Sequence, residues 1–224
     1  MMTGERVRAT VVSGGGRFAD PWHDFPETSR RLGEVAAEAG FDVAVIDDVP
    51  AALARAAALL ILDVGRPSES DAVEDAVVRA ALLAAHERGA GILAMHAAVM
   101  SFPAVPEWEA IAGGVWVDGV SMHPPYGEAR VRVTDTAHPI TAGVADFALN
   151  DERYTALRID PGVQVLAVHE HEGQAYPLLW TRTGATGRVV TDVLGHDAAS
   201  YEAGPHRVLL ARAMRWAAGD ARIR

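Results

Sequence analysis

The chain has 224 residues, half of them hydrophobic and 22% charged, which excludes a disordered or low-complexity protein. Acidic residues outnumber basic ones by 30 to 20, so the net charge of −10 argues against nucleic-acid or membrane-surface partners. The absence of cysteine excludes disulfides, thiolate metal ligands and a cysteine nucleophile. The longest apolar stretch, Ala51 to Val64, is shorter than the roughly 20 residues of a membrane-spanning helix. No signal peptide is recognisable, and we expect a cytoplasmic protein.

The first half of the sequence alternates strand-like and helix-like segments. The expected strands are Arg8–Ser13, Phe41–Ile46, Ala58–Asp63 and Gly91–Met95, and the expected helices are Glu27–Ala39 and, from a serine cap at Ser68 or Ser70, about Ser68–Arg88. Apolar strands separated by helices are typical of a parallel sheet that is covered on both faces. We therefore expect these strands to be parallel and central.

The second half has shorter, alternating strand patterns joined by glycine-containing turns. The expected strands are Ala129–Thr134, Val163–His169, Pro177–Arg182 and Arg188–Val193, and a helix over His206–Ala218 ends the chain. The turns predict hairpin strands appended to the parallel core. Because no linker separates the halves, we expect one α/β domain over residues 1–224.

Several histidines follow predicted strands or lie in loops, where an open α/β sheet binds its ligands. These are His23, His96, His123 and His196. Each of them alone is as compatible with an ordinary loop residue as with a functional one. As a group, together with Glu152, we expect them to converge in one pocket at the carboxyl edge of the sheet, although more than 170 residues separate the first from the last.

His96 lies directly after a predicted buried strand and has only small neighbours, Ala94, Ala97 and Ala98. Small neighbours allow a strand to turn sharply into a helix and to present one side chain over the sheet edge. We expect His96 to point into a cleft there, where an imidazole can act as base, acid or metal ligand. The alternative is a buried histidine that is bonded to a backbone carbonyl.

Two further groups of residues have functional and ordinary interpretations. Asp151 and Glu152 offer paired carboxylates for proton transfer or for binding hydroxyls, but acidic loops also serve solubility. Trp22, Trp116 and Tyr154 can form an apolar platform that stacks on a sugar ring, but can equally be core aromatics. His169 and the residues after it look like a solvated hairpin tip without a role.

An ordered series of short motifs resembles the ThuA-like (trehalose utilization) family over roughly Val7 to Gly219. The series consists of Gly14-Gly15 with His23-Asp24-Phe25, His96-Ala97-Ala98, Gly113-Gly114-Val115-Trp116 with His123-Pro124, His138-Pro139-Ile140-Thr141, Asp151-Glu152-Arg153-Tyr154, Pro177-Leu178-Leu179-Trp180, Gly187-Arg188-Val189, Leu194-Gly195-His196-Asp197 and Trp216-Ala217-Ala218-Gly219. The resemblance implies the flavodoxin-like fold of class I glutamine amidotransferases, a three-layer sandwich with a parallel central sheet and appended antiparallel strands.

The resemblance also implies a role in the metabolism of trehalose or related disaccharides, including oxidised 3-keto forms. In amidotransferases of this fold the sheet-edge position of His96 holds a cysteine, so this chain is not a glutamine amidotransferase. The partner that the resemblance implies is a small-molecule carbohydrate. Whether the chain forms a homo-oligomer stays open.

Three functions fit these residues. The first is a lyase, hydrolase or isomerase that acts on sugars by acid–base chemistry, with no cofactor. The second depends on a divalent metal, Zn²⁺ or Mn²⁺. The third is a non-catalytic sugar-binding or regulatory module. The expected catalytic residues are His96, Glu152 and His123; the expected substrate-binding residues are His23, Trp116, Asp151, Tyr154 and His196; the candidate metal ligands are His23, His96 and His123.

Overall fold

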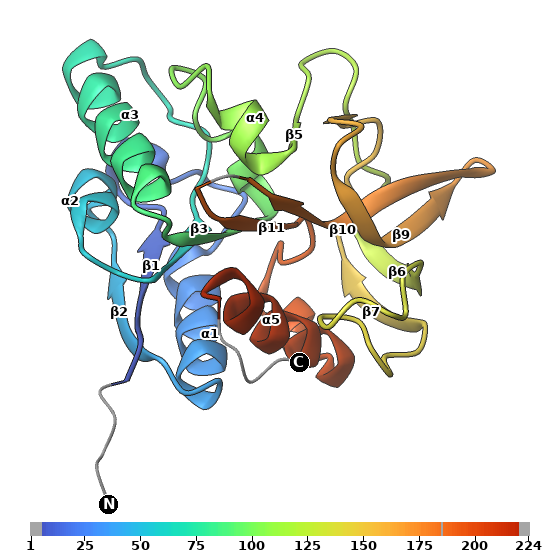
Figure 1. Cartoon of the computed structure of the whole chain (residues 1–224). Helices are drawn as coiled ribbons and strands as arrows, with labels where there is room; N and C mark the ends of the chain where they lie inside the picture. Colours follow the sequence, from blue (N-terminus) through green and yellow to red (C-terminus); the bar gives the residue numbers. More distant parts are fainter. Residues whose placement is uncertain (1–5, 185, 220–224) are drawn as a thin grey trace, which may run out of the picture.

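A nine-stranded mixed sheet runs through the protein (Figure 1), in the computed structural model that describes residues 6–184 and 186–219. In spatial order the strands are β2 (Asp42–Ile46), β1 (Arg8–Ser13), β3 (Leu59–Asp63), β4 (Gly91–Met95), β11 (Arg188–Asp192), β10 (Gln174–Thr183), β9 (Gln164–His171), β6 (Gly127–Val133) and β7 (Phe147–Asp151). Two short strands, β5 (Gly114–Val115) and β8 (Arg158–Ile159), form a separate antiparallel pair.

The strands from β2 to β11 are all parallel, with β1 between β2 and β3, and β4 between β3 and β11. If only the five parallel strands are numbered along the chain, so that β11 becomes the fifth, their spatial order is 2-1-3-4-5, the flavodoxin-like arrangement. From β11 onward the pairing is antiparallel. The prediction of an α/β fold with a parallel core and appended antiparallel strands is confirmed.

Two strands occupy positions that differ from the prediction. Asp42–Ile46 is parallel as expected, but it lies at the edge of the sheet, and its residues are exposed or only half-buried. Arg188–Asp192 is not merely a hairpin strand, because it pairs antiparallel with β10 on one side and parallel with β4 on the other. Four of its five residues are buried, since the sheet continues on both sides of it.

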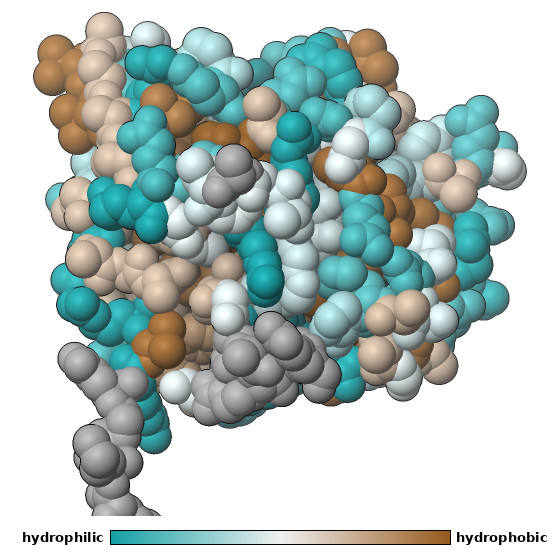
Figure 2. Space-filling model, in the orientation of Figure 1, coloured by the Kyte–Doolittle hydropathy of each residue, from teal (hydrophilic) through white to brown (hydrophobic). Residues whose placement is uncertain are grey.

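Helices cover both faces of the parallel strands (Figure 1). The helix α1 (Phe25–Glu38) packs beside α5 (Gly204–Ala217) on one face, and α2 (Val49–Ala54) packs beside α3 (Ala72–Glu87) on the other, where α4 (Trp108–Ala112) also lies. The side chains of β3 alternate between the two resulting cores: Leu59 and Ile61 face the first, and Leu60 and Leu62 face the second. On the surface in Figure 2, brown hydrophobic residues are scattered among teal hydrophilic ones.

The start of α3 is later than the sequence predicts. Asp71, not a serine, is the N-cap, and its Oδ1 accepts hydrogen bonds from the backbone N–H groups of Val73 (3.0 Å) and Glu74 (3.1 Å). The Asp71 carboxylate satisfies two of the free N–H groups of the first turn at once, and the helix therefore begins after Asp71 and not after Ser68 or Ser70.

Candidate functional site

His96 is the first residue after β4 and begins a 3₁₀-helix, His96–Met100. Its φ of 41° lies in the left-handed region, a conformation that is strained for a residue with a side chain. The imidazole is 2% exposed; Nδ1 donates to the carbonyl oxygen of Val193 (2.9 Å), which leaves Nε2 to accept from the Tyr154 hydroxyl (3.0 Å). The predicted sharp turn after β4 is therefore present. The hydrogen bond from His96 to a backbone carbonyl, which the alternative interpretation predicts, is present as well.

His23 follows β1 in a tight loop that is organised by Asp20. Oδ1 of Asp20 accepts the backbone N–H groups of Trp22 (2.9 Å) and His23 (3.0 Å), and the same carboxylate accepts Nδ1 of His23 at 2.8 Å. The His23 side chain is only 10% exposed. The carboxylate therefore fixes both the orientation of the ring and the nitrogen that carries the proton.

Asp151, the last residue of β7, joins two distant parts of the chain. Its carboxylate is fully buried and accepts the backbone N–H groups of Glu152 (2.8 Å), Gly195 (2.8 Å) and His196 (3.1 Å). These bonds hold the end of an antiparallel strand against the loop that follows β11. As a result, the side chains of Glu152 and His196 meet: Oε2 of Glu152 is 3.3 Å from Nδ1 of His196.

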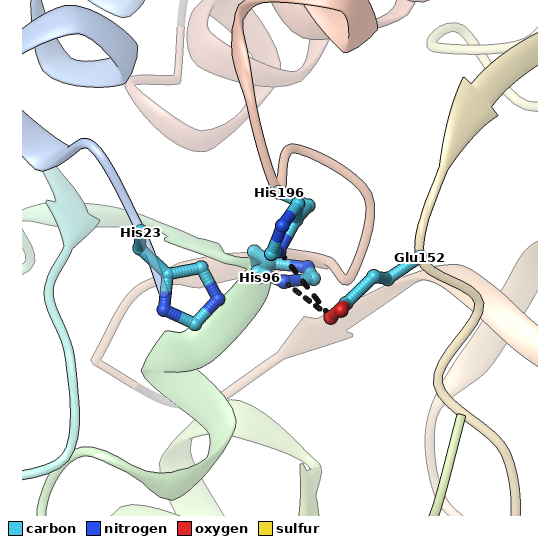
Figure 3. A group of neighbouring side chains, drawn as sticks. All are labelled: His23, His96, Glu152 and His196. Atoms are coloured by element: carbon cyan, nitrogen blue, oxygen red, sulfur yellow. Dashed lines mark ion pairs between the residues drawn. The ribbon is translucent and has the colours of Figure 1, made fainter. Parts of the chain in front are cut away.

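Four side chains converge at the carboxyl edge of the parallel strands (Figure 3). These are His23, His96, Glu152 and His196, which we call the histidine–glutamate cluster. Each offers one ligand atom, and these atoms all lie within 4.8 Å of one another. His23, His96 and His196 follow the parallel strands β1, β4 and β11, whereas Glu152 follows the antiparallel strand β7 and is brought to this edge by the Asp151 hydrogen bonds. In the part of the chain that the structure describes, no second group of this kind is found.

The charges of the cluster are coupled. Burial opposes ionisation of Glu152, but its contacts with His196 and His96 outweigh that effect and hold the pKa of the carboxyl well below its usual range. Burial lowers the pKa of His96, despite Glu152. For His196 burial acts in the same direction, but Glu152, Asp151 and Asp197 more than offset it and raise the pKa. The cluster thus contains a fixed negative charge beside a neutral, buried His96.

The other predicted site residues lie around this cluster. His123 is more exposed (39% of its side chain), and its Nδ1 is 3.6 Å from Oε1 of Glu152, so it borders the cluster without belonging to it. The Trp116 ring is half-buried, with its centroid 5.0 Å from that of Tyr154. Tyr154 itself is 2% exposed. Its hydroxyl is directed at His96.

Two expectations need correction. Asp151 was expected to bind substrate, but its buried carboxylate is committed to three backbone N–H groups, so it positions its neighbours instead. His169 was expected at a solvated hairpin tip, but it is 1% exposed, and its Nε2 donates to the carbonyl oxygen of Tyr154 (3.1 Å). In both cases the hydrogen-bond partner lies in a segment distant in sequence, the loop after β11 for Asp151 and Tyr154 for His169.

Sequence reasoning missed two residues beside the cluster. Asp20, three positions before His23, carries a detectable signal, because a carboxylate at that spacing in a tight loop can reach the imidazole. Tyr126, 43% exposed, has its ring centroid 5.6 Å from that of His196. No pattern in the sequence connects Tyr126 with His196, since they come together only through the packing of two loops.

The family model for ThuA, described as trehalose utilisation, matches residues 8–217. The chain belongs to the ThuA family. Membership indicates a role in trehalose utilisation or carbohydrate metabolism. Among curated proteins, none matches the sequence well enough to be reported as a relative.

Solved structures with similar folds include other ThuA-like proteins. One from Parabacteroides merdae is 19% identical, with a TM-score of 0.78, 96% of this chain covered and 90% of that one. One from Bacteroides uniformis is also 19% identical, with a TM-score of 0.74 and coverages of 97% and 93%. A cytoplasmic protein from Salmonella typhimurium is 11% identical, with a TM-score of 0.63 and coverages of 95% and 99%. At such low identities, the similarity to these structures establishes the fold of the chain and nothing further. None of the helices described here is long and apolar enough to cross a membrane.

Proposed function

We propose that this ThuA family chain is an enzyme that converts a disaccharide, or a sugar derived from one, at the histidine–glutamate cluster. The observation that carries the proposal is the convergence of three imidazoles and one carboxylate from four separate segments at the sheet edge. Titratable groups with perturbed pKa values gather at active sites more often than elsewhere. The family's association with trehalose utilisation supplies the class of substrate.

The reaction that suits these residues is proton transfer next to a carbonyl group. In a 3-keto sugar the carbonyl acidifies the C–H bond at C2, so that one base can remove this proton and leave an enolate. Reprotonation on the other face gives an epimer, and loss of the C1 substituent with its bonding electrons gives an elimination product. The enolate oxygen is negative, and preorganised positive or hydrogen-donating groups stabilise such charge.

The half-exposed His123 is the side chain best suited to exchange a proton with the substrate, because it borders the cluster and retains contact with solvent. Glu152, 3.6 Å away, can orient it and stabilise its protonated form. His96 was expected as the acid or base, but its burial and its two hydrogen bonds suit a group that binds or polarises. We thus assign the proton exchange to His123 because its side chain is exposed to solvent, and not only because it lies near Glu152.

A panel of plain and 3-keto disaccharides tests the proposal, with product formation followed by mass spectrometry. We expect the wild-type protein to convert at least one of them. His123→Gln and Glu152→Gln should lower the rate by about 10²- to 10⁴-fold, while His171→Gln, a change at a histidine outside the cluster, should have no effect. Binding of a sugar without conversion would favour the binding module, and full activity of Glu152→Gln would move the reaction to another site.

A further inference from the structure

The proton positions of two histidines in the cluster are fixed from outside. His23 donates from Nδ1 to the Asp20 carboxylate (2.8 Å), and His96 donates from Nδ1 to the Val193 carbonyl oxygen (2.9 Å). In each ring Nε2 therefore carries the lone pair. In His96 this lone pair accepts the Tyr154 hydroxyl (3.0 Å), a hydrogen bond that a metal ion would replace. An imidazole that donates one N–H to a carboxylate or backbone carbonyl and presents its other nitrogen is the usual arrangement of a histidine ligand to a metal.

Buried ring nitrogens in the cluster have no hydrogen-bond partner among the described residues. These atoms are Nε2 of His23 and Nδ1 of His196; the latter is 3.3 Å from Oε2 of Glu152, an ion-pair distance without hydrogen-bond geometry. The His23 side chain is nine-tenths buried, so bulk water does not readily replace the missing partner. Buried polar atoms are paired in almost all native proteins, and a bound ion or an ordered water is what usually satisfies one that has no partner in the protein.

The carboxylate of the cluster has no permanently charged partner in the described ion pairs. In the described part of the chain, the ion pairs of Glu152 involve only histidines: His96, His123 and His196. No lysine or arginine of the described residues forms an ion pair with the half-buried Glu152 carboxylate. Three imidazoles and one carboxylate are the nitrogen and oxygen donors that zinc and its neighbours in the first transition row accept, whereas Mg²⁺ and Ca²⁺ favour oxygen donors.

The spacing of the atoms allows one ion to contact all four groups. Ligand atoms about 2.1 Å from a tetrahedral zinc ion lie about 3.4 Å from one another. The ligand atoms of the cluster lie within 4.8 Å of one another, so side-chain movements of about 1 Å bring them to that spacing. We propose that His23, His96, His196 and Glu152 bind one divalent transition-metal ion per chain, with Zn²⁺ as the ion that fits best.

This assignment replaces one of the ligands expected from the sequence. His123 was grouped with His23 and His96, but the structure puts it on the outer side of Glu152, outside the four-residue group. Metal binding itself does not depend on the proposed sugar conversion. What depends on it is the use of the ion: with a fifth coordination position open to a substrate oxygen, the ion would polarise that oxygen, and His123 would exchange the proton from the solvent side.

Calorimetric titration of tag-free protein, stripped with a chelator and then dialysed, tests the proposal. We expect one Zn²⁺ per chain and no binding of Mg²⁺. His23→Gln and His196→Gln should each weaken Zn²⁺ binding by about 100-fold or more, and Asp20→Asn, which leaves all four ligands in place, by roughly 10- to 100-fold. His171→Gln is the matched control and should bind as the wild type does. Circular dichroism establishes that each variant is folded.

Three results would overturn the assignment: no stoichiometric Zn²⁺ binding by the folded wild type, unchanged binding by His23→Gln and His196→Gln, or loss of binding in His171→Gln. The fate of the proposed function is separate. Stoichiometric Zn²⁺ binding at these residues supports the metal site even if no sugar is converted. Full sugar conversion by chelator-treated protein that binds no Zn²⁺ would remove the metal site and leave the proposed function intact.

Discussion

Asp151→Asn is a sharp test of how the fold assembles the cluster. The substitution keeps one oxygen, which can still accept the N–H groups of Glu152 and His196, and replaces Oδ2, the acceptor of the Gly195 N–H, by an amide that donates. A hydrogen bond to a charged group contributes about 1.5–3 kcal/mol, and the Gly195 N–H is buried. We therefore expect the free energy of unfolding to fall by about 2–3 kcal/mol.

The assay is urea denaturation followed by circular dichroism, in the presence of a chelator so that metal binding does not contribute. Asp42→Asn makes the same chemical change at an exposed carboxylate of β2 and should shift the free energy of unfolding by less than about 0.5 kcal/mol. If Asp151→Asn were as stable as Asp42→Asn, the carboxylate of Asp151 would not hold the two segments together, and the explanation of the cluster would be wrong.

Three further substitutions give distinct outcomes. Gly195→Ala should destabilise the fold by about 2–3 kcal/mol in urea, because φ is +113° and a Cβ would lie 2.7 Å from the Tyr201 hydroxyl; an unchanged midpoint would mean that the loop relaxes freely. Burial lowers the pKa of His206, but Asp192 outweighs it and raises the pKa above that of the unfolded chain, so wild-type stability should fall as pH rises above about 6.5, and His206→Gln should make that fall smaller; parallel profiles would contradict this. Burial raises the pKa of Asp63 to about 6, so wild-type stability should fall as pH rises from about 4 to 6, and this fall should be absent in Asp63→Asn. Equal slopes of the two proteins over that range would exclude the burial effect.

The parallel core is readable from the sequence because its strands are continuous apolar runs. Leu59 to Asp63 and Gly91 to Met95 are buried on both faces, and only a strand covered by helices on either side has that composition. The position of Arg188–Asp192 is not readable in this way. Its pattern predicts a strand, but whether it pairs with β4 depends on how far the preceding hairpin reaches, which is a property of the whole sheet.

The membership of the cluster was only partly predictable, for a similar reason. That His96 lies at the carboxyl edge follows from the predicted parallel strand before it; that His196, four residues after β11, lies at the same edge follows only once β11 is known to pair parallel with β4. That Glu152 faces inward while His123 stays half-exposed depends on Asp151, whose hydrogen bonds to a loop 44 residues further along the chain turn the backbone at this point. Hydrogen bonds between segments so far apart leave no periodic pattern in the sequence.

The most direct measurement of the central claim is anomalous X-ray diffraction at the zinc absorption edge, from crystals of the tag-free protein grown with Zn²⁺. We expect one strong anomalous peak per chain, about 2.0–2.1 Å from ring nitrogens of His23, His96 and His196 and from an oxygen of Glu152. No peak at these residues, or a zinc ion bound at His123 or at a histidine elsewhere on the surface, would contradict it.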